Sequence, residues 1–535
     1  MWSKACLTER APSATRKLSP GSFMPNVRTL VGAVLCMLLD CSHAAPRGAA
    51  PVRIEEATID ELQGAMSAGE LTSHTLVQHY LDRIALYDKQ GPKLNAFLLV
   101  NPRALDEADR LDRERASKGP RGPLHGIAVV LKDNMNTADL PTTGGSLAFA
   151  GAQPRADAFV VSKLRQAGAV FLGKTNLHEL ARAGTTVSSL GGQTLNPYDL
   201  TRTPGGSSGG TAVAVATNMA SVGLGSDTVN SIRSPASACD LVGLRPTRGL
   251  VSRSGIIPAA LTQDMAGPIG RTVADVAVVL EVIQGPDAKD PTTVDAAGMA
   301  KRTYRDALVQ DGLRGARIGV LRSFFGAKPE HHEVNRVVGE AIARMRSLGA
   351  EPIELQMPLD VEQLIASMDV QKWESKTQID AWLRDLGPGA PPIHTFDDWV
   401  ASGKFDKTLE KGLKAAQPFD HPENDPEYLQ RIGPRKEALQ KQVIAILGEN
   451  KLDAIVYPHQ KRLVVPIGES QVERNGFLAS ITGFPAITVP AGFSSGGVPI
   501  GVELLGRPYA EPTLLKLAYA YEKGTHNRRP PATAP

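Results

Sequence analysis

The feature that most restricts the possible folds of this chain is an alternation of apolar strands and helices after a Gly/Pro-rich break at residues 119–123. Ile127 to Leu131 is apolar at every position, which is typical of a strand covered on both faces of its sheet. Residues 159–166 have helical spacing, and residues 169–172 form the next strand-like run. This alternation predicts an α/β fold.

The same reasoning places elements along the rest of the chain. Thr58 to Glu61 is a capping box that predicts a helix start. Periodicity does not decide between helix and strand for residues 212–216. Residues from about 370 to 440 carry three tryptophans and little strand signal, and we expect a mostly helical excursion over one edge of the sheet whose aromatics pack beneath it, with a substrate entrance as the alternative. Further helices are expected at 76–87, 104–114, 334–345 and from Pro512, and further strands at 317–321, 353–355, 454–457, 486–489 and 500–505.

The N-terminal 45 residues differ from the body. They hold five basic and two acidic residues, which accounts for the whole net charge of +3, so the body is neutral and nothing favours nucleic acid or an anionic membrane as a partner. Arg28 precedes the apolar run 30–39, and Ser42-His43-Ala44 is a possible cleavage site. The leader therefore predicts export, and a disordered extension of a cytoplasmic protein is the alternative. Its apolar run is too short to span a bilayer, which takes about 20 residues.

Three of the four cysteines also lie in the leader. The body keeps only Cys239, so no disulfide is expected within residues 46–535, the expected catalytic domain. One cysteine also excludes a zinc pattern, and the cluster His331-His332-Glu333 is expected to be solvated rather than metal-binding. The sequence thus predicts neither a metal nor another cofactor.

Lys132 and two serines are the candidate reactive groups. Lys132 ends the apolar strand, and open α/β sheets place their sites at the carboxyl ends of strands. Lysine is a general base only when neutral, so its pKa would have to fall from about 10.4 to about 7 through burial. No histidine lies beside either serine, which indicates acyl transfer based on lysine. A lysine that reaches solvent is the alternative.

Ser207 lies in the glycine-rich run 205–210, and Ser231 precedes the helix start expected at Ser234-Pro235. Glycines allow a ligand to approach the backbone closely. A plain flexible loop and a phosphate-binding loop are the alternatives, and the absence of a following Gly-Lys-Ser/Thr counts against the phosphate-binding loop. A serine before a helix start has backbone N–H groups nearby that can stabilise an oxyanion.

These residues resemble the amidase signature family in order and spacing. The resemblance rests on Leu124-His-Gly-Ile127 with Lys132-Asp133, Gly173 to Glu179, Gly205 to Gly210, Ser231-Ile-Arg233, Gly267-Pro-Ile269, Gly483 to Ala486 and Pro499-Ile-Gly501. It covers residues 54–525 and implies one α/β/α domain with a large mixed β-sheet covered by helices. It further implies that Ser231 is the nucleophile, that Ser207 follows a cis peptide and passes a proton, and that Lys132 is the base.

The resemblance also implies an oxyanion hole made by the backbone N–H groups of Thr228, Val229, Asn230 and Ser231. Many members have Gly-Gly before the serine, where this chain has Val229-Asn230. A β-branched valine adopts positive φ badly, so we expect an altered loop whose two side chains narrow the acyl side of the pocket or redirect substrate choice.

The expected activity is hydrolysis of a small-molecule carboxamide to a carboxylic acid and ammonia or an amine. A glutamine-hydrolysing subunit of a tRNA-dependent amidotransferase is the second interpretation, and a catalytically silent binding protein on the same fold is the third. A homodimer is a possible assembly.

Overall fold

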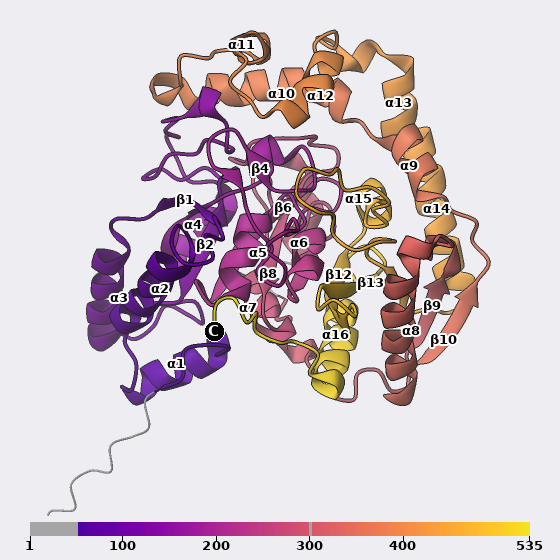
Figure 1. Cartoon of the computed structure of the whole chain (residues 1–535), viewed down its shortest axis with the longest axis horizontal. Helices are drawn as coiled ribbons and strands as arrows, with labels where there is room; N and C mark the ends of the chain where they lie inside the picture. Colours follow the sequence, from indigo (N-terminus) through magenta and orange to yellow (C-terminus); the bar gives the residue numbers. More distant parts are fainter. Residues whose placement is uncertain (1–51, 299–301) are drawn as a thin grey trace, which may run out of the picture. The chain divides into compact units, whose positions relative to one another are not determined.

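A mixed sheet carries the fold of the computed structural model, which describes residues 52–298 and 302–535. Its eleven strands lie in the order β1-β3-β2-β6-β8-β7-β12-β13-β11-β9-β10 (Figure 1). The strands are β1 Phe97–Val100, β2 Ala128–Lys132, β3 Val170–Thr175, β6 Val222–Asp227, β7 Val242–Arg245, β8 Met265–Gly270, β9 Arg317–Leu321, β10 Glu351–Leu355, β11 Ala454–Pro458, β12 Ala486–Phe493 and β13 Pro499–Leu505, and β4 Val187–Ser188 and β5 Gly192–Gln193 form a separate pair.

Helices cover the sheet on both sides. Every residue of β2, β3 and β6 is buried, and successive side chains of a strand point to opposite faces. The helices are α1 Ile59–Ala68, α2 Ser73–Tyr87, α3 Ala104–Lys118, α4 Phe159–Gln166, α5 Gly209–Ala216, α6 Arg233–Ala238, α7 Val273–Ile283, α8 His332–Ser347, α9 Val361–Met368, α10 Gln371–Leu386, α11 Phe396–Ser402, α12 Glu410–Ala416, α13 Pro426–Ile432, α14 Pro434–Glu449, α15 Phe477–Thr482 and α16 Glu511–Thr525. The predicted large mixed α/β sheet is therefore confirmed.

Local predictions hold where one face of an element is buried. The capping box at Thr58 and Glu61 starts α1, and α4 has the predicted bounds. Residues 212–216 belong to helix α5, which is buried at every position, so its apolar residues show no single face.

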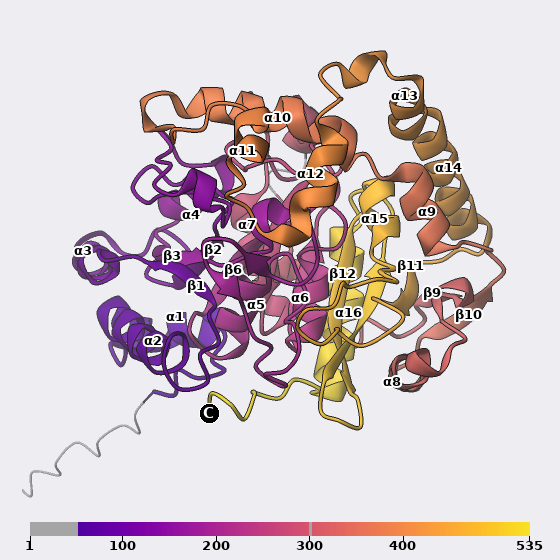
Figure 2. The same ribbon diagram turned by 45° about the horizontal axis from the view of Figure 1, so that its top comes forward.

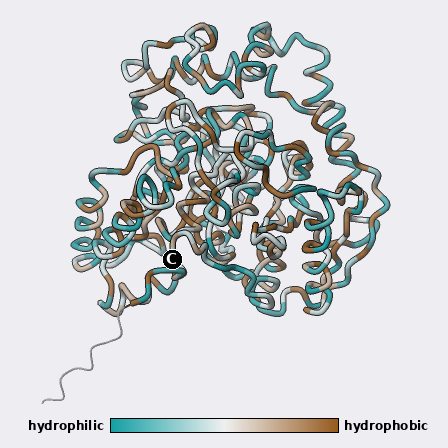
Figure 3. The backbone as a smooth tube through the Cα atoms, viewed as in Figure 1, coloured by the Kyte–Doolittle hydropathy of each residue, from teal (hydrophilic) through white to brown (hydrophobic). Residues whose placement is uncertain are grey.

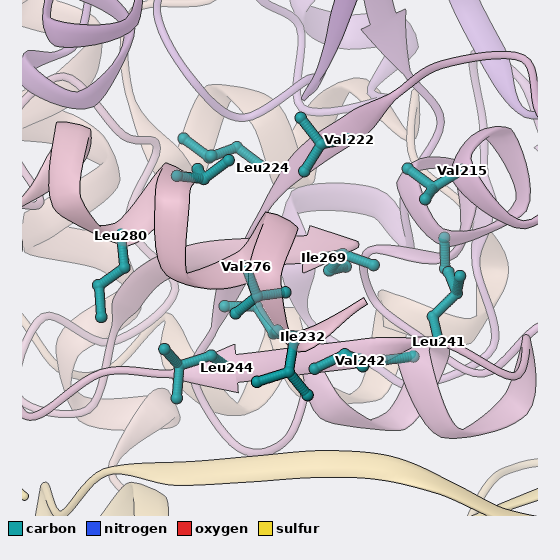
Figure 4. Close-up of a cluster of buried hydrophobic side chains, with 14 of the residues drawn as sticks. Val215, Val222, Leu224, Ile232, Leu241, Val242, Leu244, Ile269, Val276 and Leu280 are labelled. Carbon is teal, nitrogen blue, oxygen red and sulfur yellow. The ribbon is translucent and has the colours of Figure 1, made fainter. Parts of the chain in front are cut away.

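The core lies between the central strands and their helices. Figure 4 shows Val222 and Leu224 of β6 beside Ile269 of β8, with Val276 of α7 packed close to Ile269. Hydrophobic segments of the described chain, brown in Figure 3, run mainly through these inner strands and helices, and the outer helices are mostly teal. This packing holds β2 and β6 in fixed register.

The helical excursion is confirmed, but its predicted position over an edge of the sheet is wrong. In Figures 1 and 2, α10, α11 and α12 lie beyond one end of the strands. Their apolar cluster contains Trp382 and Trp399, and it packs on Phe149 and Leu180 from the loops that follow β2 and β3. The tryptophans thus serve packing, as expected.

The leader and its three cysteines lie outside the described residues, so export, the boundary near residue 45 and a homodimer stay predictions. Cys239 is buried and unpaired in the described part of the chain. None of the helices within residues 52–298 and 302–535 has the length and apolar character needed to cross a bilayer.

Candidate active site

The carboxyl ends of β2 and β6 bring Lys132 and two serines together. The strands run parallel, with Leu131 opposite Leu224, so Lys132 ends beside Ser226. Lys132 is fully buried, and its Nζ lies 2.6 Å from Ser207 Oγ, 2.8 Å from Ser226 Oγ and 3.3 Å from the Ser226 carbonyl oxygen. Asn134 Nδ2 donates to Ser226 Oγ at 2.9 Å. The hydrogen-bond partners of Lys132 in the described chain are thus all oxygen atoms.

Burial sets the protonation of this lysine. It lowers the pKa of Lys132 to about 7, although Asp227 and Asp264 act in the opposite direction. A neutral amine has two N–H groups and one lone pair. The two Ser226 oxygens can accept both N–H groups, which leaves the lone pair for the Ser207 hydroxyl. Ser226 and Asn134 were not predicted, because neither lies in a pattern that signals contact with a lysine.

The loop that carries Ser207 is fixed by backbone contacts. The Gly206–Ser207 peptide is cis, as the family resemblance implied. The His178 N–H donates to the Ser207 carbonyl at 3.0 Å, and Thr186 Oγ1 donates to the Gly205 carbonyl at 2.7 Å. Gly205 has a φ of 72°, which favours glycine at this position. The Ser207 hydroxyl is therefore presented to Lys132 by a restrained loop.

Ser231 lies between β6 and α6, next to the Ser207 loop. The Ser208 N–H donates to the Ser231 carbonyl at 3.2 Å, and Ser231 is 4% exposed. Among the described residues, no hydrogen bond joins the Ser207 and Ser231 hydroxyls. The structure thus brings the two loops together through their backbones, and the proton transfer between the two hydroxyls stays a prediction.

The predicted helix start at Ser234-Pro235 is wrong by two residues, because α6 begins at Arg233. Asp227 Oδ2 accepts the Ile232 N–H at 3.1 Å, and the Asn230 carbonyl accepts the Ser234 N–H at 2.7 Å. The Asp227 carboxylate and the Asn230 carbonyl therefore order a helical turn earlier than the local Ser-Pro signal indicates. Ser231 still precedes the helix, as predicted.

A buried ion network holds this loop. Asp227 lies between the fully buried Arg233 and Arg245, with contacts of 3.1 Å and 2.9 Å. Burial by itself would raise the pKa of Asp227, but the two guanidinium groups hold it far below its ordinary value. Arg233 also pairs with Glu503 at 2.5 Å, and His459 contacts Glu503 at 2.6 Å. The network connects residues too distant in sequence for a local pattern to reveal.

The backbone N–H groups of Thr228, Val229, Asn230 and Ser231 have no acceptor among the described residues. Neither Val229 nor Asn230 has a positive φ, so the loop avoids the conformation that valine tolerates badly. Val229 packs in the apolar cluster that includes Phe477 of α15. Both side chains are buried, and the small cavity of about 10 Å³ beside the site is lined by Thr228, Ser226 and Asn134 but by neither of them. Their predicted effect on substrate choice stays a prediction.

His331 belongs to a different kind of site from the one expected. It is buried, and its Nε2 lies 3.0 Å from Glu473, so the expectation that the cluster is solvated is wrong for His331, whereas His332 is exposed. Glu330, His331 and Glu473 have ligand atoms within 4.8 Å of one another. Lys328 Nζ lies 3.1 Å from Glu473, however, so a lysine ammonium group already balances the charge of the carboxylate that a metal ion would bind. We interpret the cluster as an ion pair.

Comparisons with known proteins agree with this geometry. A family model described as Amidase matches residues 75–515. A glutamyl-tRNA(Gln) amidotransferase subunit of Methanosarcina mazei is 35% identical over 483 residues, 88% of this chain and 96% of that protein, and a probable amidase of Arabidopsis thaliana is 36% identical over 500 residues, 89% and 92% of the two chains. The crystal structure of native peptide amidase from Stenotrophomonas maltophilia has a TM-score of 0.83 at 38% identity and covers 91% of this chain and 100% of that one.

Proposed function

The chain belongs to the amidase signature family of amide-hydrolysing enzymes, and from this premise we propose that it hydrolyses linear carboxamides through an acyl-enzyme on Ser231. The observation that carries the proposal is the buried Lys132 Nζ, 2.6 Å from Ser207 Oγ, with its pKa lowered to about 7. A lysine that is half neutral near pH 7 is a competent general base.

We assign the proton path to Lys132, Ser207 and Ser231, as the family resemblance implies. Neutral Lys132 accepts the Ser207 proton, Ser207 accepts the Ser231 proton, and Ser231 Oγ attacks the amide carbon. The C–N bond breaks as the nitrogen receives a proton by the same path in reverse. Water then attacks the Ser231 ester, and the carboxylic acid leaves with Ser231 restored. The free N–H groups of Thr228 to Ser231 are suited to stabilise the oxyanion in both steps.

The amidotransferase interpretation keeps a specific observation in its favour, the 35% identity with the Methanosarcina mazei protein. The likeness to peptide amidase, at 38% identity and a TM-score of 0.83, favours an amidase. Copurification of two smaller partner proteins from the native organism, with activity that depends on them, would favour the amidotransferase instead. A silent binding protein would not react with a fluorophosphonate.

The test is a panel of primary amides, anilides, esters and carbamates with the wild-type enzyme and Ser231→Ala. We expect turnover of at least one amide by the wild type and none by the variant. The matched control is Ser189→Ala, which removes a serine hydroxyl that accepts the Leu147 N–H at 2.9 Å and has no place in the proton path. Equal activity of Ser231→Ala and the wild type would overturn the proposal.

A further inference from the structure

A pocket with an excess of cationic residues lies near the loop that carries Ser207. A solvent-open cavity of about 280 Å³ is bounded by residues 182–183 and by α10 and α12 of the excursion. Its charged lining residues are Arg182, Lys372, Arg474 and Asp369. The lining therefore holds three cations and one carboxylate, an excess of positive charge that the proton path does not use.

The two arginines are half-buried, and some of their buried N–H groups lack acceptors. Arg182 donates from Nη1 to Ser375 Oγ, but its Nε and Nη2 are buried without an acceptor, as is Nε of Arg474. No carboxylate among the described residues forms an ion pair with either one. Burial lowers the pKa of Arg182 to about 10 and also lowers the pKa of Arg474, while Asp369 acts in the opposite direction on both. Other arginines, such as Arg245 and Arg271, also have an unpaired Nε, but Arg182 and Arg474 line a solvent-open pocket, where a ligand can supply the acceptors.

The pocket shares a wall with the Ser207 loop. A Cβ placed on Gly184 would lie 3.6 Å from Arg474 Nη1, and one placed on Gly206 would lie 2.7 Å from the Gly184 carbonyl carbon. Thr408, which lines the pocket, lies 3.3 Å from His178 Nε2, and the His178 N–H holds the Ser207 carbonyl. A series of contacts therefore connects the arginine pocket, through Gly184 and His178, to the loop that carries Ser207.

We propose that Arg182 and Arg474 bind a carboxylate carried by the substrate, so that the enzyme prefers amides with a negative charge remote from the scissile bond. The inference rests on the proposed function and narrows its substrate class. A guanidinium presents N–H groups in a planar fork that matches a carboxylate, and a partly desolvated site makes each charge-assisted hydrogen bond stronger. Lys372 adds charge at the rim, where it also lies 4.0 Å from the Trp373 ring.

The kinetic test uses half-amides of dicarboxylic acids, from succinamate to suberamate, against alkanamides in which a methyl group replaces the carboxylate. We expect the wild type to prefer the carboxylate in kcat/KM by at least about tenfold at one chain length. Arg474→Met and Arg182→Met should each lose that preference and keep their rate on the alkanamide. Arg113→Met, which removes an exposed arginine, is the matched control and should keep the preference.

Three outcomes would overturn the inference: no preference in the wild type, an unchanged preference in both variants, or a rate on the alkanamide that rises when free succinate is added. The last outcome would indicate a site for an activating anion. Absence of all amide turnover, with the wild type equal to Ser231→Ala, would instead refute the proposed function.

A binding test decides the inference without turnover. In Ser231→Ala, suberate should raise the Tm, and the neutral diamide of the same length should not, because only a ligand of the folded state stabilises it. The further change Arg474→Met should abolish the rise, and Arg113→Met should preserve it. Equal Tm shifts in these two double variants would overturn the inference.

Discussion

The pH dependence of catalysis should report the pKa of Lys132. Burial lowers that pKa to about 7, below the ordinary 10.5, so the base is neutral above pH 7 and charged below it. The neutral fraction is then about 9% at pH 6, half at pH 7 and about 91% at pH 8. We therefore expect kcat/KM to rise about tenfold between pH 6 and pH 8 and then to become level. An ordinary lysine would instead give a rise of about a hundredfold over this range, continuing toward pH 10.

The assay is release of ammonia from a neutral alkanamide, because such a substrate does not titrate in this range. A second readout is stability. The pKa of Lys132 is lower in the folded state than in the unfolded state, so from about pH 7 to pH 10 the unfolded chain binds more protons. The stability of the wild type should thus rise with pH by up to about 1.4 kcal/mol per pH unit relative to Lys132→Met. Lys118→Met, at an exposed helix end, is the control. A rate that keeps climbing above pH 9, together with no such difference in slope, would refute the reasoning.

Three other changes test the remaining parts of the site. Ser207→Ala should reduce kcat by about 10²- to 10⁴-fold at every pH, because it removes the proton carrier between Lys132 and Ser231, and ammonia release measures this; a smaller loss would contradict the relay. Asp227→Asn should lower the free energy of unfolding by about 3–5 kcal/mol, since it leaves two buried guanidinium groups without their shared carboxylate, and calorimetry against Asp60→Asn on the surface of α1 checks it. The double change Val229→Gly/Asn230→Gly should alter the ratio of kcat/KM for bulky and small amides, and an unchanged ratio would end the hypothesis that these residues set selectivity.

Local periodicity predicted those elements that bury one face or lie fully within the sheet. Residues 127–131 and 159–166 are examples, because a run of apolar residues or a helical repeat is determined by nearby positions alone. The order of strands was not predictable in this way. β6 pairs with β2 on one side and with the antiparallel β8 on the other, and this depends on packing across the whole chain.

The residues of the site also fall into those that the sequence predicted and those that it did not. The resemblance identified Lys132, Ser207 and Ser231, and the structure places Lys132 against Ser207. The resemblance did not identify Ser226, which positions the Lys132 amine. It also did not identify Glu503, which is 270 residues from Arg233 and pairs with it. The helix near Ser231 begins earlier than the Ser-Pro signal predicts, because Asp227 accepts the Ile232 N–H, a contact that no adjacent residue signals. Long-range polar contacts, rather than local propensity, determine these details.

The most direct test of the central claim is to identify the residue that a fluorophosphonate modifies. The reagent phosphonylates an activated serine and releases fluoride, so peptide mass spectrometry locates the nucleophile. We expect one adduct, on Ser231, that is absent from Ser231→Ala and forms much more slowly in Lys132→Met. An adduct on Ser207 or elsewhere, or undiminished labelling of Ser231→Ala, would contradict the account.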